Sequence, residues 1–155
     1  MNPKPEDLGE PALIIAGLQL WVHGYQFVNS NDYHDANWLR VTTHAGAAGA
    51  SVWATGAILM VPDLLGLGNE CEALAQGRAQ AAKLAPLEPE LLITISRRDR
   101  LGHFTMQVAI TPDHMTQEHS FQFEVDQSEL LAVARQCRAI VAKFPVRCAE
   151  ANPGV

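Results

Sequence analysis

The stretch N-S-N-D-Y-H-D-A-N-W-L-R-V, residues 29–41, is where residue types that can bind a metal or move a proton lie closest together. It holds Asp32, His34 and Asp35 beside a tyrosine and a tryptophan. A metal site needs three or four ligands that converge at about 2.0 to 2.2 Å. On an extended segment, Asp32 and His34 point to one side and Asp35 to the other. The stretch therefore supplies at most two ligands, and these three residues are the local candidates for a metal or acid and base site.

The same composition also suits a polar turn, because aspartate and asparagine side chains readily bond to backbone groups a few residues away. In this interpretation the aspartates shape the entry of a core strand, and Asn37 and Trp38 lead into it. We prefer the turn, since the alternation of the segment separates the two aspartates.

Nucleophilic residues form no catalytic motif in this sequence. Ser51 and Ser120 begin predicted strands and lack the G-x-S-x-G turn that exposes a catalytic serine. The three cysteines form no C-x-x-C pair, and Cys71 and Cys137 fall at apolar positions of predicted helices, where a thiol behaves as a small hydrophobe. The connection 112–119 holds two histidines and two acids, which we interpret as a solvated loop. The sequence therefore predicts no catalytic residue and no cofactor.

Three tryptophans, Trp21, Trp38 and Trp53, fall in predicted strands of the N-terminal half. Tryptophan anchors protein cores, and it also dominates interface hot spots where it is exposed. The sequence favours the core and leaves an exposed aromatic patch as the alternative. If Trp38 belongs to the core, its replacement by alanine costs about 3 to 5 kcal/mol of folding free energy.

The overall composition describes one mildly acidic domain. The 155 residues include 17 acidic and 11 basic ones, for a formal net charge of -6. No basic stripe is present, so direct nucleic-acid binding is not expected, whereas a basic protein partner would suit this charge. The start of the chain lacks a secretory pattern, and no apolar run reaches the roughly 18 residues of a membrane span. We therefore expect a cytoplasmic protein.

The first secondary-structure elements are predicted from alternation and turn residues. Residues 1–11 hold three prolines and three acids, and we expect a flexible N-terminal segment. Residues 12–27 alternate as one or two strands, with Gly17 or Gly24 marking a bend or bulge.

A hairpin and a helix are predicted next. Residues 37–61 form two β-branched and aromatic runs around a small-residue connection, which indicates a hairpin. Pro62 ends the second strand, and Asp63 is expected to cap a helix over residues 64–84.

Three more strands are predicted over residues 90–98, 103–111 and 120–125. A final helix is predicted over residues 126–144. The sequence therefore predicts a single α+β domain over residues 12–147, followed by a frayed tail at 148–155. Its sheet is mainly antiparallel, with about six strands and two helices in the order βββα-βββα.

Residues 25–41, Y-Q-F-V-N-S-N-D-Y-H-D-A-N-W-L-R-V, resemble the segment Y-x-F/Y-P-x-x-x-D-x-W-D-x-N-W-L-x-V of bacterial immunity proteins of the WapI type, the partners of polymorphic toxins delivered at cell contact. Weaker similarity extends over about residues 13 to 147, including L-E-P-E-L-L-I-T-I and the closing A-K-F-P-V-R. Two positions depart from the pattern, because Val28 stands where proline is usual and His34 replaces a tryptophan. The residues that fall on the family pattern are Tyr25, Phe27, Asp32, Asp35, Asn37, Trp38, Leu39, Glu88, Pro89, Phe144, Pro145 and Arg147.

The resemblance implies a non-enzymatic cytoplasmic immunity protein that binds and neutralises a cognate toxin domain. Its expected partner is a basic toxin domain, and neither nucleic acid nor a membrane is expected to bind. Two alternatives stay open. One is a small metal-dependent or acid and base enzyme that uses Asp32, His34 and Asp35. The other is a structural or assembly subunit, for which a homodimer is an option. The sequence does not identify the binding surface.

Overall fold

The computed structural model describes residues 5–148. The first four residues of the predicted flexible segment, and all but the first residue of the predicted tail, lie outside this range. At the start of the described residues, Pro5–Asp7 forms a single turn of 3-10 helix. The indole N–H of Trp21 then donates to the carbonyl of Gly9 at 2.9 Å, which ties this segment to the following strand.

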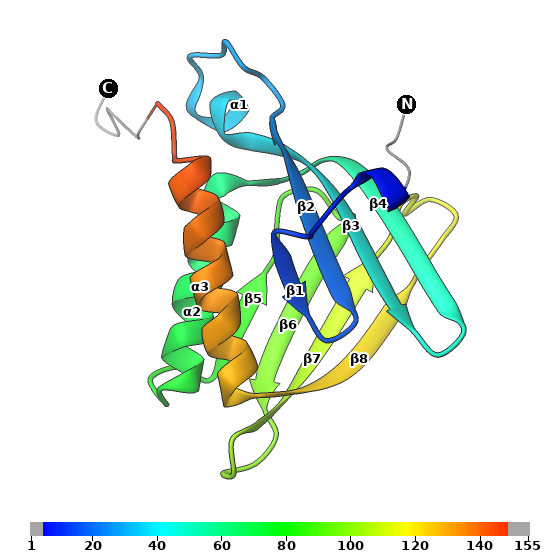
Figure 1. The fold of residues 1–155 in the computed structure, drawn as a ribbon, viewed down its shortest axis with the longest axis vertical. Helices are drawn as coiled ribbons and strands as arrows, with labels where there is room; N and C mark the ends of the chain where they lie inside the picture. The colour runs from blue at the N-terminus through cyan, green and yellow to red at the C-terminus, as the bar shows by residue number, and fades with distance from the viewer. Residues whose placement is uncertain (1–4, 149–155) are drawn as a thin grey trace.

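Each half of the chain is a four-stranded antiparallel meander followed by a long helix (Figure 1). Sheet A comprises β1 (Leu13–Ile15), β2 (Leu18–Tyr25), β3 (Trp38–Ala47) and β4 (Ala50–Met60). Sheet B comprises β5 (Ala81–Leu84), β6 (Leu91–Arg97), β7 (His103–Ile110) and β8 (Ser120–Asp126). The helices are α1 (Tyr33–Asn37), α2 (Val61–Ala75) and α3 (Gln127–Lys143).

The core lies between the two sheets and beneath the two long helices. Sheet A lies in front of sheet B in Figure 1, and β3 contacts both β7 and β8. Helices α2 and α3 run side by side along one flank, where Gly68 allows a close approach because a Cβ there would lie 2.9 Å from the Cβ of Cys137. Buried residues of both sheets and both helices form one continuous cluster. No helix of the described part of the chain is long and apolar enough to cross a membrane.

The predicted alternation of the strands is confirmed. On β3, the side chains of Leu39, Val41 and Thr43 are buried on one face. Strands β6 and β7 bury every second residue against the core, as their sequences predict. The two possible glycine irregularities both occur, since Gly17 lies in the turn between β1 and β2 and Gly24 interrupts the register of β2 with β3.

The α+β class is confirmed, but the single sheet of about six strands with two helices is wrong in detail, and the short α1 is the additional helix. The described residues form eight strands in two separate sheets. Strands β1 and β5 have three and four residues, too few for a clear alternation pattern. Helix α2 connects the last strand of sheet A to the first strand of sheet B. A local pattern in the sequence does not show whether strands on either side of such a helix belong to one sheet or to two.

The helix predicted over residues 64–84 is shorter than expected. It ends at Ala75 because Gly77 adopts a φ of 76° and closes a Schellman motif, in which the N–H of Arg78 donates to the carbonyl of Ala73. The alanine-rich segment that follows forms β5. At the other end, Pro62 lies in the first turn of α2 and Asp63 accepts from the backbone N–H of Met60. Asp63 therefore caps the helix from inside its first turn and not from the N-cap position.

Candidate functional site

The β2–β3 loop, residues 26–37, contains the candidate acid and metal residues, and it ends in the short helix α1. Asp32 is the N-cap of α1, and its carboxylate accepts the backbone N–H of Asp35 at 3.1 Å. The N–H of Asp32 donates to the hydroxyl oxygen of Ser30. These local bonds between side chain and backbone are the ones expected of a polar turn. The expected extended geometry is wrong, because residues 33–37 are helical.

The three candidates do not gather into a metal site. His34 and Asp35 are exposed, and the His34 ring lies edge-on to the ring of Tyr33 with centroids 5.5 Å apart. Within residues 5–148, no three histidine, cysteine, aspartate or glutamate side chains form a group that could hold a metal ion.

Arg147 holds the β2–β3 loop from the far end of the chain. Its guanidinium donates to the carbonyl oxygens of Phe27, Val28 and Ala36 at 2.6 to 2.9 Å. The same group lies 3.8 Å from the centre of the Tyr25 ring. A planar cation with five N–H groups suits this geometry, because it reaches several carbonyls at once.

Asn37 completes the attachment from within α1. Its side chain is fully buried, and its amide donates to the carbonyls of Tyr33 and Arg147 at 2.7 and 2.9 Å. Its amide oxygen accepts the backbone N–H of Arg147 at 2.8 Å. Asn37 therefore joins the loop to the C-terminal segment through both ends of its amide.

Tyr25 supplies the third contact between the two segments. Its hydroxyl donates to the carbonyl of Pro145 at 2.6 Å, and its ring meets that of Phe144 edge to face. Burial raises the pKa of Tyr25, although the neighbouring Arg147 lowers it. We call Tyr25, Asn37, Phe144 and Arg147 the Arg147 cluster.

The other residues of the resemblance lie in different settings. Leu39 is fully buried, whereas Trp38 is only half-buried and pairs with Met60 across the sheet. Glu88 and Pro89 are exposed on the connection between β5 and β6, and no hydrogen bond joins them to the Arg147 cluster among the described residues.

The outer face of sheet A holds aromatic and histidine residues that the sequence did not bring together. Trp53 is 36 % exposed and stacks on the buried Trp21 with ring centroids 5.7 Å apart. His44 packs on Trp53 at 4.3 Å, and its Nε2 lies 2.7 Å from the hydroxyl of Ser51. The tryptophans therefore divide between core and surface. The register of the hairpin, which pairs His44 with Trp53, is the signal that would have predicted this contact.

The histidines of this face favour the neutral state. Burial lowers the pKa of His44. Burial and the nearby Arg40 lower the pKa of His23, whose Nε2 lies 2.7 Å from the hydroxyl of Thr42. A neutral His44 can accept the proton of Ser51, but its buried Nδ1 has no hydrogen-bond partner in the described part of the chain. The third group that orients the base in a catalytic triad is therefore not among the residues that contact His44.

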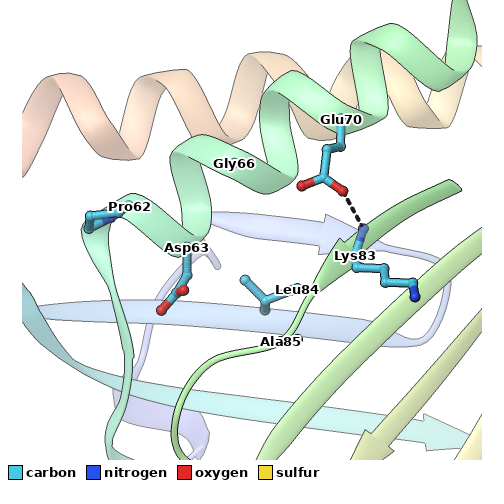
Figure 2. A pocket seen from close by; sticks show the side chains of 7 residues that line it. All are labelled: Pro62, Asp63, Gly66, Glu70, Lys83, Leu84 and Ala85. Atoms are coloured by element: carbon cyan, nitrogen blue, oxygen red, sulfur yellow. Dashed lines mark hydrogen bonds between the residues drawn. The ribbon is translucent and has the colours of Figure 1, made fainter. Parts of the chain in front are cut away.

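A groove of about 380 Å³ lies between α2 and β5 (Figure 2). Glu70 accepts the backbone N–H of Lys83 there at 3.2 Å, so its carboxylate satisfies a donor on the free edge of sheet B. Burial raises the pKa of Asp63, which also lines the groove, although the N–H of Met60 lowers it. The carboxylates of Asp63 and Glu70 therefore both accept hydrogen bonds from backbone N–H groups.

A second hollow of about 200 Å³ lies between sheet A and α3, with Val22, Ile140, Lys143 and Phe144 in its wall. It lies beside the Arg147 cluster through Phe144. Neither hollow contains Asp32, His34 or Asp35.

The two helix cysteines are buried, as predicted. Cys71 on α2 and Cys137 on α3 are free thiols with no exposed surface. Burial raises the pKa of each to about 12, so both remain protonated and unreactive at neutral pH.

Comparison with curated proteins and with solved structures gave no match. Comparison with protein families gave a match to the immunity protein WapI-like family over residues 14–145. This range covers all of α3 and both sheets except Leu13, the first residue of β1, and it ends just before Arg147. The resemblance found in residues 25–41 is thereby confirmed over most of the sequence, and the chain belongs to the WapI-like immunity protein family.

Proposed function

We propose that this chain is a non-enzymatic immunity protein that binds and neutralises a cognate toxin domain in the cytoplasm. The observation that carries the proposal is the family match over residues 14–145. The toxin domain is expected to be basic, because the chain has a formal net charge of -6 and opposite charge speeds association.

The use of the candidate residues supports binding over chemistry. Asp32 caps α1, and Arg147 and Asn37 attach the loop to the C-terminal segment. These contacts suit a rigid scaffold, which loses little conformational entropy when it binds a partner.

The test starts from the gene beside the one for this chain: if that gene encodes a large toxin, its C-terminal domain is the partner to examine. Co-expression with the immunity protein should restore growth of cells that make the toxin domain. In vitro, toxin activity should fall linearly as the purified protein is added and should vanish near an equimolar ratio.

The endpoint of this titration separates binding from catalysis. An enzyme that modifies the toxin would inactivate it at ratios far below equimolar, given time. A toxin domain that is neither bound nor inhibited would remove the proposal for this pair of proteins. Size-exclusion chromatography of the isolated protein distinguishes a monomer from the homodimer expected of an assembly subunit.

A further inference from the structure

Two adjacent apolar side chains are exposed on the β2–β3 loop. Phe27 is 45 % exposed and Val28 is 68 % exposed. Single exposed apolar residues are common on protein surfaces, but an apolar pair that is held rigidly and bordered by charge is typical of an interaction site.

The backbone that carries these side chains is fixed. Arg147 donates to the carbonyls of both Phe27 and Val28 at 2.8 Å, so both peptide units are held in place before any partner arrives. A rigid loop that presents an aromatic side chain binds with a smaller loss of entropy than a mobile one.

Exposed acidic side chains follow the apolar pair within the same loop. Asp32 and Asp35 are exposed, and neither belongs to an ion pair of the described residues, which join Arg98 to Glu124, Arg138 to Glu72 and His103 to Asp99. The cation that bonds to this loop, Arg147, directs its guanidinium to backbone carbonyls and to the Tyr25 ring. The carboxylate of Asp35 therefore remains available to an external cation, whereas that of Asp32 already accepts the backbone N–H of Asp35 with one oxygen.

The exposed Trp53 marks a competing surface on the outer face of sheet A. Its charge suits a basic partner less well, because Arg40 lies close enough to His23 on this face to lower the pKa of that histidine. Positive charge there would repel lysine and arginine side chains.

We use the name loop face for the exposed loop residues Phe27, Val28, Asp32, His34 and Asp35. We propose that the loop face docks the toxin domain, through an apolar patch on the toxin that is flanked by lysine or arginine side chains. This inference rests on the proposed function, and it assigns the contact surface within it.

The experiment measures binding of the purified chain to a catalytically inactive form of the toxin domain that is used to test the proposed function. Phe27→Ala should weaken the affinity about tenfold or more, because it removes the central aromatic contact. Asp35→Lys should slow association and reduce the dependence of the association rate on salt. Asp35 is the better acid to change, since Asp32 is needed to cap α1.

Two matched variants control for lost apolar surface and for changed net charge. Leu101→Ala removes an exposed side chain on the β6–β7 turn, and Glu118→Lys makes the same charge change on the β7–β8 loop. Figure 1 draws both segments well away from α1. Both variants should bind like the wild-type protein, and all four should keep its thermal unfolding midpoint.

The outcomes separate this inference from the proposed function. If the wild-type protein binds and both loop-face variants bind equally well, the loop face is not the contact surface, although the immunity function stands. Weakened binding of Trp53→Ala with unchanged binding of Phe27→Ala would assign the contact to sheet A and overturn the inference. If the wild-type protein itself fails to bind, the proposed function fails first.

Discussion

The β2–β3 loop and the β7–β8 loop, residues 111–119, have similar composition and different anchoring. Each holds histidine and acidic residues. The β2–β3 loop bonds to Arg147, which lies 110 positions beyond Asn37 in the sequence. In the β7–β8 loop, Asp113 accepts from the N–H of Met115 and the hydroxyl of Thr116, two and three positions away. Similar side chains thus make hydrogen bonds to a distant segment in one loop and shape a local turn in the other.

The difference shows that a dense group of polar residues has at least three uses. In the β2–β3 loop the buried Asn37 joins distant segments and the exposed Asp32 caps α1, whereas Asp35 is the acid that we propose for partner binding. In the β7–β8 loop the polar groups shape the turn itself. The position of the hydrogen-bonding partner separates these uses, and residue type does not.

Arg147→Ala should have the largest effect, because it leaves several carbonyls of the β2–β3 loop without their donor. We expect a loss of about 3 to 4 kcal/mol in the free energy of unfolding, measured in urea. Arg147→Lys keeps the charge and lacks the planar fork, so it should recover less than half of the loss. A change below about 1 kcal/mol would mean that the loop does not need this anchor.

Asn37→Ala should be the next most damaging change. It removes the bonds to Tyr33 and Arg147 from a fully buried position, and we expect a loss of about 2 to 3 kcal/mol. Asn37→Asp keeps the oxygen that accepts from Arg147 but loses both amide donors, so chemical denaturation should show it unfolding more easily than the wild-type protein. Equal stability of Asn37→Asp would show that the amide donors are dispensable.

Trp38→Ala tests how far the anchored region extends into β3. Since the side chain is half-buried, the expected loss is about 2 kcal/mol, below the range for an enclosed tryptophan. Unchanged thermal stability together with lost toxin binding would move Trp38 from the scaffold to the contact surface.

The pH dependence of stability should distinguish the Arg147 cluster from the outer face of sheet A. The pKa values of His23 and His44 are lowered in the folded protein, so the unfolded chain binds protons more readily. The stability that the two neutral histidines contribute is therefore present at neutral pH and declines as the pH falls through about 6.5, the ordinary histidine pKa.

The measurement compares unfolding in urea at pH 7.5 and pH 5.5. The combined His23→Gln and His44→Gln variant should show a smaller decline than the wild-type protein. The loss caused by Asn37→Ala should be the same at both pH values, because an amide does not titrate. A loss that grew on acidification would couple the Arg147 cluster to the histidines.

Asp113→Ala should have the smallest effect. Its two bonds are local and exposed, so the thermal unfolding midpoint should stay close to that of the wild-type protein. A clear drop in the midpoint would show that the β7–β8 loop contributes to stability beyond its own turn.

The parts of the fold that the sequence predicted are those with a local pattern. The β3–β4 hairpin, the alternation of β6 and β7 and the stripe of α3 all repeat within about ten residues. Strand β5 was missed because its alanine-rich sequence also suits a helix, and tertiary pairing with β6 decides its structure.

The candidate site was predicted only in part, for the same reason. The sequence indicated a polar turn at residues 29–37, and Asp32 does cap α1 through a local bond. The carbonyl acceptors of Arg147 could not be predicted, since backbone groups carry no sequence signal. The contact of His44 with Ser51 needed the exact hairpin register, which periodicity does not provide.

The attachment of the β2–β3 loop to Arg147 also sets an order of events during synthesis. At about 5 to 20 residues per second, a ribosome takes roughly 5 to 20 s to proceed from Asn37 to Arg147. Sheet A can pair during this interval, because its strands are adjacent in the sequence. The loop gains its last anchor only after α3 has been made. A nascent chain that has not yet reached Arg147 therefore displays the loop without this anchor, and the loop takes its final shape only after Arg147 has been made.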